Sequence, residues 1–229
     1  MIEEPPLLTI RENFPRPAAA EVAALAGAQT SHLADCMLGR GALDYRIKPL
    51  SESQSRLIGV AVTAHAYPAD NLAVLGAIAE ARAGDVVIVA NDGYTGTSLI
   101  GDHLAGMMRN KSIAGFVTDG LVRDRAGILA TGLPVFAAGV SPNSPARTGP
   151  GTVGLAIQVG GVRVQSGDVV VGDGDGVVVI PREELALVIE RLKAVRAAEA
   201  AVEAKVRAGA ILSDAARELL ASPRIMRVR

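Results

Sequence analysis

The stretch from Gly84 to Ala137 decides the fold, and it reads GDVVIVANDGYTGTSLIGDHLAGMMRNKSIAGFVTDGLVRDRAGILATGLPVFA. Short apolar runs bounded by Gly, Asp or Pro are typical of buried strands. They predict strands at Val86–Ala90, Gly115–Thr118 and Leu133–Ala137. Helical spacing in the intervening segments predicts helices at Leu99–Arg109 and Leu121–Ala130. This alternation of strands and helices indicates an α/β domain with a parallel sheet.

The flanking sequence extends this core in both directions. Upstream, apolar spacing predicts helical segments within 18–38, a strand at Leu57–Ala66 and a helix at Asn71–Arg82. Downstream, short β-runs follow at Val153–Val159, Val162–Gln165, Val169–Val171 and Gly176–Ile180. Beyond Pro181, a long helix to about Ala208 and a shorter one to Leu220 are expected. We therefore expect a single domain over 1–229, with a core at about 20–181 and C-terminal helices at about 182–221.

Composition limits the classes of function. Of 229 residues, 49% are hydrophobic and 21% are charged, which indicates a folded chain with surface available for self-association. The formal net charge is -1 and no basic run occurs, so we expect no nucleic-acid partner. No apolar run is long enough for a membrane span. A single cysteine, Cys36, and an acidic, proline-broken start favour a cytoplasmic location.

A candidate anion site lies at the start of the helix that follows the Val86–Ala90 strand. The sequence there is Gly101-Asp102-His103-Leu104. The first turn of a helix presents unpaired backbone N–H groups that can bind a carboxylate or phosphate. The alternative is that Asp102 or Ser98 simply caps the helix.

Arg123 and Asp124 follow the next strand and could reach the same pocket. A guanidinium and a carboxylate together suit a small anionic substrate and a hard divalent cation such as Mg²⁺ or Mn²⁺. An adjacent Arg-Asp pair is also common on solvated surfaces, so this pattern alone leaves both interpretations open.

Glu199 interrupts an apolar stripe on the long C-terminal helix, where Val188, Leu192, Val195, Val202 and Val206 recur at helical spacing. Its carboxylate either reaches solvent at the edge of the stripe or meets a polar group, such as the site of a neighbouring subunit.

Other motifs carry less information. Asp173-Gly174-Asp175-Gly176 is interpreted as a hairpin turn, since it lacks the downstream Glu of a calcium loop. The three histidines have no Cys or His partner at metal-ligand spacing, although His103 lies in the proposed anion site. There is no nucleophile elbow, dinucleotide fingerprint or Walker loop.

Three segments taken together resemble the RraA-like family, and in particular its class II 4-hydroxy-4-methyl-2-oxoglutarate/4-carboxy-4-hydroxy-2-oxoadipate aldolases. These segments are 101–105 (GDHLA), 119–124 (DGLVRD) and 166–181 (SGDVVVGDGDGVVVIP). The resemblance covers roughly residues 20 to 210. It implies a swivelling β/β/α sandwich with a C-terminal helical extension, and a homotrimer or a hexamer built from trimers.

The resemblance also implies roles for individual residues. Asp124 would ligate the divalent metal, and Arg123 would bind the pyruvoyl part of a 2-oxo acid substrate. The amides from Gly101 through His103 to Leu104 would hold its carboxylate. Asp102, and Glu199 of an adjacent subunit, match carboxylates that hold water at the metal.

These roles suit the cleavage of a 4-hydroxy-2-oxo diacid to pyruvate, which requires stabilisation of an enolate. Arg123 would place positive charge beside the enolate oxygen. No Schiff-base lysine is expected, because none of the four lysines lies in the pocket motifs. Decarboxylation of oxaloacetate gives the same enolate and is therefore a possible side activity.

Two alternatives remain open at this stage. One is a non-enzymatic regulator of an RNA-degrading endonuclease, resembling RraA itself. Such regulators lack the acidic residue after the pocket arginine and the long C-terminal helix, whereas this chain has both. The other is a lyase or decarboxylase for another 2-oxo acid, whose distal end would be contacted by residues such as Tyr94, His103 or Arg147.

Overall fold

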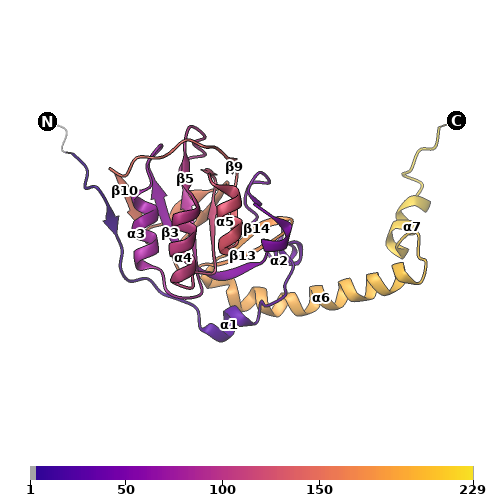
Figure 1. The fold of residues 1–229 in the computed structure, drawn as a ribbon. Helices are drawn as coiled ribbons and strands as arrows, with labels where there is room; N and C mark the ends of the chain where they lie inside the picture. Colours follow the sequence, from indigo (N-terminus) through magenta and orange to yellow (C-terminus); the bar gives the residue numbers. More distant parts are fainter. Residues whose placement is uncertain (1–3, 229) are drawn as a thin grey trace.

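The computed structural model describes residues 4–228, which form three layers around a nine-stranded sheet (Figure 1). In spatial order the strands are β1 (Thr9–Ile10), β10 (Gly151–Val153), β3 (Leu57–Ala66), β4 (Asp85–Ala90), β6 (Gly115–Thr118), β8 (Val135–Ala137) and β2 (Lys48–Pro49). Strand β13 (Val169–Asp173) also pairs with β3, and β14 (Gly176–Ile180) pairs with β13. Strands β3, β4, β6 and β8 are parallel, which confirms the predicted parallel sheet.

Three helices cover one face of this sheet, namely α3 (Leu72–Glu80), α4 (Asp102–Asn110) and α5 (Arg125–Thr131) (Figure 1). Val87 and Val89 of β4 face these helices. Val86 and Ile88 face the opposite layer, because successive strand side chains point to opposite faces. Both faces of β4 are buried, as its continuous apolar run requires.

The other face of β4 is covered mainly by the β13–β14 hairpin, which joins the sheet through residues 57–60 of β3, and by a second hairpin, β11 (Ile157–Val159) with β12 (Val162–Val164). Asp173 and Gly176 pair at the end of the β13–β14 hairpin. The Asp-Gly segment is therefore the hairpin turn that the sequence predicts. Asp173 also accepts hydrogen bonds from the backbone N–H of Thr30 (2.8 Å) and its hydroxyl (2.7 Å).

The C-terminal helix packs on the body only at its start. α6 (Leu185–Arg207) follows the short helix η2 (Arg182–Glu184) and packs against α1 (Ala19–Ala23) and α2 (Thr30–Cys36). Leu185 and Leu192 are buried there. The rest of α6 projects away from the body and carries α7 (Asp214–Ala221) near its tip (Figure 1). Ser213 is the N-cap residue of α7, because its side chain accepts from Ala216 N at 3.1 Å.

Several predicted boundaries differ from those in the structure. The helices predicted to start at Leu99 and Leu121 begin later, because their first residues form short strands, β5 (Ser98–Ile100) and β7 (Leu121–Val122). With β9 (Gly139–Val140) these make a separate three-stranded parallel sheet in the order β5-β7-β9. The predicted Val153–Val159 strand is divided at Gly154, where φ is +78°. The remaining short helix, η1, spans Glu52–Gln54.

No helix within residues 4–228 is long and apolar enough to cross a membrane.

Candidate functional site

The small sheet β5-β7-β9 brings the two predicted motifs together. Each of its strands follows a main-sheet strand in the chain, so that β4 leads to β5, β6 to β7 and β8 to β9. α4 begins directly after β5, and α5 begins shortly after β7. The two helices pack side by side (Figure 1). The starts of α4 and α5 therefore meet at one edge, beyond the carboxyl ends of the parallel strands.

The first turn of α4 has the form expected of an anion site. Gly101 is the N-cap residue, and its carbonyl accepts from Ala105 N at 3.1 Å. His103 N donates to Asp102 Oδ1 at 2.8 Å. Among residues 4–228, the N–H groups of Asp102 and Leu104 have no acceptor. Leu104 itself is buried in the core, so it can contribute only its backbone N–H to a ligand.

Arg123 and Asp124 lie between β7 and α5, and not within a helix as the sequence predicts. Arg123 N donates to Ile100 O at 2.9 Å, which fixes this backbone against β5. Arg123 Nε lies 3.1 Å from Asp124 Oδ2. Asp124 is the N-cap of α5 and adopts a left-handed conformation with φ of +54°. Such a backbone is strained for a non-glycine residue, and such strain is concentrated at functional sites.

Two glycines make room for the two carboxylates. A Cβ at Gly101 would collide with Asp124 Oδ2 and would lie 3.1 Å from Arg123 Nε. A Cβ at Gly127 of α5 would lie 2.8 Å from Asp102 Oδ2. The structure therefore gathers Gly101, Asp102, Arg123 and Asp124, which the sequence predicts to share one site.

Sequence reasoning did not identify Ser144. Arg123 Nη1 donates to the hydroxyl of Ser144, which follows β9. A lone serine in a proline-containing loop carries no pattern that predicts such a contact. Only the approach of β9 to β7 brings this serine to the guanidinium.

Glu199 is not brought to this site within one chain. It is exposed on the part of α6 that projects from the body (Figure 1). Its stripe is buried only at the start, because Val188 is 1% exposed whereas Val202 is 52% and Val206 is 59% exposed. Contact of Glu199 with a neighbouring subunit's site stays a prediction.

The residues proposed for the distal end of a substrate are also exposed. His103 and Arg147 are exposed, and no side-chain hydrogen bond joins either to the rest of residues 4–228. Tyr94 lies against Gly96 of its own loop, because a Cβ at Gly96 would overlap its phenol ring. These three side chains do not form a closed pocket in the single chain.

Asp119, which belongs to the segment 119–124, has a structural role. Its Oδ1 accepts from Asn91 N at 2.9 Å, so it holds the end of β4. Burial raises the pKa of this carboxyl, despite hydrogen bonds from the backbone N–H groups of Asn91 and Gly93 that lower it.

Asp102 in the first turn of α4 and Asp124 at the N-cap of α5 are the carboxylates of this site that are available to hold a divalent cation. No group of three or more His, Cys, Asp or Glu side chains within residues 4–228 is arranged to hold a metal. Mg²⁺ is commonly bound by one or two carboxylates together with water and substrate oxygens, so a larger protein cluster is not required. Asp124 is 44% exposed and can present an oxygen to such an ion.

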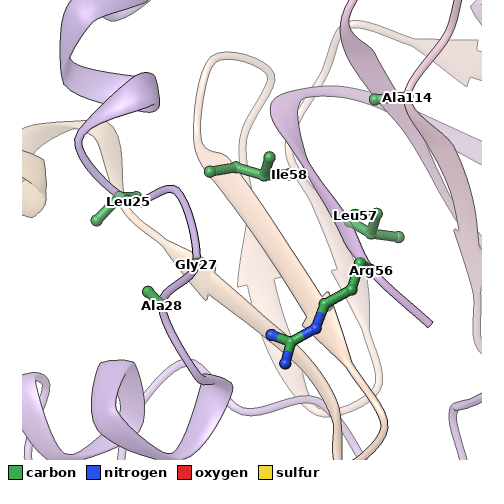
Figure 2. Close-up of a pocket in the computed structure, with 8 residues that line it drawn as sticks. Leu25, Gly27, Ala28, Arg56, Leu57, Ile58 and Ala114 are labelled. Atoms are coloured by element: carbon green, nitrogen blue, oxygen red, sulfur yellow. The ribbon is translucent and has the colours of Figure 1, made fainter.

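A separate cavity of about 520 Å³ lies between the turn joining α1 to α2 and the start of β3 (Figure 2). Leu25 and Ile58 contribute to its apolar lining, and Arg56 is its one charged lining residue. None of the predicted site residues lines it.

Comparison with known proteins supports the family resemblance that the three segments carry. The family model for RraA-like proteins, described as Aldolase/RraA, matches residues 30–179. This chain belongs to the RraA-like family. The match covers the segments 101–105 and 119–124 in full and most of 166–181, and it ends before α6 begins.

Relatives in this RraA-like family include a protein of Halalkalibacterium halodurans that carries the name of a proposed 4-hydroxy-4-methyl-2-oxoglutarate aldolase. It is 37% identical over 174 residues, which is 76% of this chain and 82% of the relative. An uncharacterised protein of Methanocaldococcus jannaschii is 33% identical over 73% of this chain and 81% of its own length.

Solved structures confirm the RraA-like fold. The RNA-processing inhibitor RraA from Thermus thermophilis is 30% identical with a TM-score of 0.62, over 67% of this chain and 93% of that one. An uncharacterised protein from Pseudomonas syringae has a TM-score of 0.77 and 25% identity, over 89% of this chain and 100% of that one.

Proposed function

We propose that this protein is a divalent-metal-dependent class II aldolase that cleaves a 4-hydroxy-2-oxo diacid, such as 4-hydroxy-4-methyl-2-oxoglutarate, to pyruvate and a second oxo acid. The observation that carries the proposal is the meeting of Arg123 and Asp124 with Gly101 at the first turn of α4. The relative of Halalkalibacterium halodurans supports the same class of reaction.

The reaction needs positive charge where the substrate becomes negative. Cleavage of the C3–C4 bond leaves its electron pair on the pyruvate fragment as an enolate, with charge on the C2 oxygen. Arg123 supplies a permanent positive charge for that oxygen. The open N–H groups of Asp102 and Leu104 hold the adjacent carboxylate at the helix N-terminus.

A Mg²⁺ or Mn²⁺ ion held by Asp124 would supply Lewis-acid polarisation of the 2-oxo group when bound. Because Asp124 Oδ2 lies 3.1 Å from Arg123 Nε, the same carboxylate also orients the guanidinium beside the substrate oxygen.

Two further carboxylates serve proton transfer in this proposal. Asp102, and Glu199 from an adjacent subunit, orient a water that accepts the proton of the C4 hydroxyl and returns a proton to the enolate. Loss of CO₂ from oxaloacetate forms the same enolate, so decarboxylation of oxaloacetate follows as a side activity.

Self-association as a trimer, or as a hexamer built from trimers, is part of the proposal. The stripe on α6 continues as exposed Val202 and Val206 beyond the body of the chain. Packing of this segment on a second copy would cover the stripe and bring Glu199 to another subunit. Exposed apolar surface of this kind marks protein interfaces.

A regulator of RNA processing is the second candidate, and the likeness to the Thermus RraA favours it. The chain departs from the regulators in having Asp124 and α6, which supports catalysis. A lyase or decarboxylase for another 2-oxo acid is the third candidate, because Tyr94, His103 and Arg147 do not define the distal pocket.

The test is pyruvate release coupled to lactate dehydrogenase. The substrates are 4-hydroxy-4-methyl-2-oxoglutarate and oxaloacetate, each with Mg²⁺, with Mn²⁺ and with EDTA. Rapid pyruvate formation that EDTA removes is expected. Absence of activity on both, with folded protein and added metal, would contradict this substrate assignment and favour the other candidates.

A further inference from the structure

The loop after β9 holds the guanidinium of Arg123 through a single side chain. Arg123 Nη1 donates to Ser144 Oγ, and Arg123 Nε pairs with Asp124 Oδ2 at 3.1 Å. Among residues 4–228, Nη2 has no acceptor. Two partners thus fix the plane of the guanidinium and leave one edge open for a substrate oxygen.

Ser144 can fix this plane because its own loop is anchored on the preceding side. Asn143 O accepts from Ser98 N at 2.9 Å and from Ser98 Oγ at 2.7 Å. Asn143 Nδ2 donates to Gly96 O at 3.0 Å. Three hydrogen bonds therefore hold the residue next to Ser144 against the segment that leads into β5.

The same loop is anchored on the following side by Asp70. This carboxylate is 3% exposed and accepts from Thr148 N at 2.5 Å and from Gly149 N at 3.0 Å. Ala146 adds two backbone hydrogen bonds, with Ala69 O at 2.7 Å and Asn71 N at 3.0 Å. Ser144 thus lies between two fixed points of the loop.

We infer that Ser144 is a positioning residue, which orients the Arg123 guanidinium toward the oxygen that becomes negative during the reaction. The inference rests on the proposed function and names a residue of the same site that acts through Arg123. Ser144 is exposed, and hydrogen bonds at exposed positions add little to folding. Its removal therefore changes orientation far more than stability.

The experiment compares Ser144→Ala with Ser144→Thr, which keeps the hydroxyl. Ser141→Ala is the matched control, because no hydrogen bond joins the Ser141 side chain to the rest of residues 4–228. Ser144→Ala should lower kcat/KM about tenfold, mainly through kcat, because the lost orientation matters most as charge develops. Ser144→Thr should recover most of the loss, and Ser141→Ala should match the wild type.

A double-mutant cycle shows whether Ser144 acts through Arg123. In an Arg123→Lys background, Ser144→Ala should cause no further loss, because the oriented guanidinium is already absent. An equal loss in both backgrounds, or a Ser144→Ala variant within twofold of the wild type, would overturn the inference.

A readout without catalysis separates this inference from the proposed function. The Nε–Hε signal of Arg123, followed by ¹⁵N NMR relaxation, should report a rigid side chain in the wild type and in Ser144→Thr, and a mobile one in Ser144→Ala. If no substrate yields pyruvate, the proposed function fails, yet this pattern would still support positioning by Ser144. Equal mobility in all three proteins would contradict it.

Discussion

The Asp124 carboxylate lies so close to the Cα of Gly101 that a Cβ at position 101 would overlap its Oδ2 atom. Gly101 is extended, with φ of -126°, so its backbone conformation does not require glycine. The requirement comes from the close approach of the Arg123 and Asp124 side chains to the helix N-terminus.

Gly101→Ala should therefore displace Asp124 and Arg123 while the helix still forms. We expect kcat/KM to fall on the order of 10- to 100-fold, since misplacement of a catalytic group by about an ångström has such an effect. Gly106→Ala is the control on the same helix, because nothing lies within 4 Å of its Cβ position. That variant should keep wild-type kcat/KM, and equal activity of Gly101→Ala would contradict the close-approach argument.

Asp70 should give the stability of the protein a specific pH dependence. Burial acts to raise its pKa, but backbone N–H groups of Leu72, Thr148 and Gly149 and the Thr148 hydroxyl together hold it below the usual value. A lowered folded-state pKa adds stability above the pKa of the unfolded chain, which is lost as pH falls through the folded value.

Asp70→Asn should accordingly reduce the free energy of unfolding by about 1–3 kcal/mol at pH 7. The difference from the wild type should shrink as the pH falls below the ordinary range of an aspartate pKa, because the wild-type carboxyl then becomes protonated. Urea unfolding at pH 7 and at low pH measures this difference in the free energy of unfolding. Asp35→Asn, on the exposed end of α2, is the control. A difference independent of pH would show that the charge of Asp70 is not the cause.

Glu199 can be tested by mixing two inactive variants. Arg123→Ala and Glu199→Ala subunits, unfolded and refolded together, should regain activity if each site joins residues of two subunits. Random assembly predicts about a quarter of the wild-type sites. Each variant refolded alone is the control, and a mixture no more active than either alone would place Glu199 outside the site.

How much the sequence predicts depends on whether a contact is local. Strand β3 occupies Leu57–Ala66 as predicted, because its own alternation of side chains specifies it. Leu121–Val122 carries a helical pattern, yet it forms β7 because it pairs with β5 and β9. That pairing depends on segments distant in the chain, which a local pattern does not record.

The residues of the candidate site also differ in this respect: local motifs predict some of them and do not predict others. Gly101, Asp102, Arg123 and Asp124 were predictable because each lies in a motif that follows a strand. Ser144 was not, since its hydrogen bond to Arg123 spans 21 positions and depends on how the loop after β9 is anchored. Glu199 stays a prediction because its proposed contact lies outside a single chain.

Exchange of the pyruvate methyl protons in D₂O tests the central claim most directly, because it needs only enolate formation and no knowledge of the distal part of the substrate. Mass spectrometry of pyruvate incubated with the protein and Mg²⁺ or Mn²⁺ should show rapid deuterium incorporation. EDTA should abolish it, and Arg123→Lys and Asp124→Asn should reduce it severely. Incorporation by the folded wild-type protein no faster than in buffer with the same metal would contradict the claim that this site stabilises a pyruvate enolate.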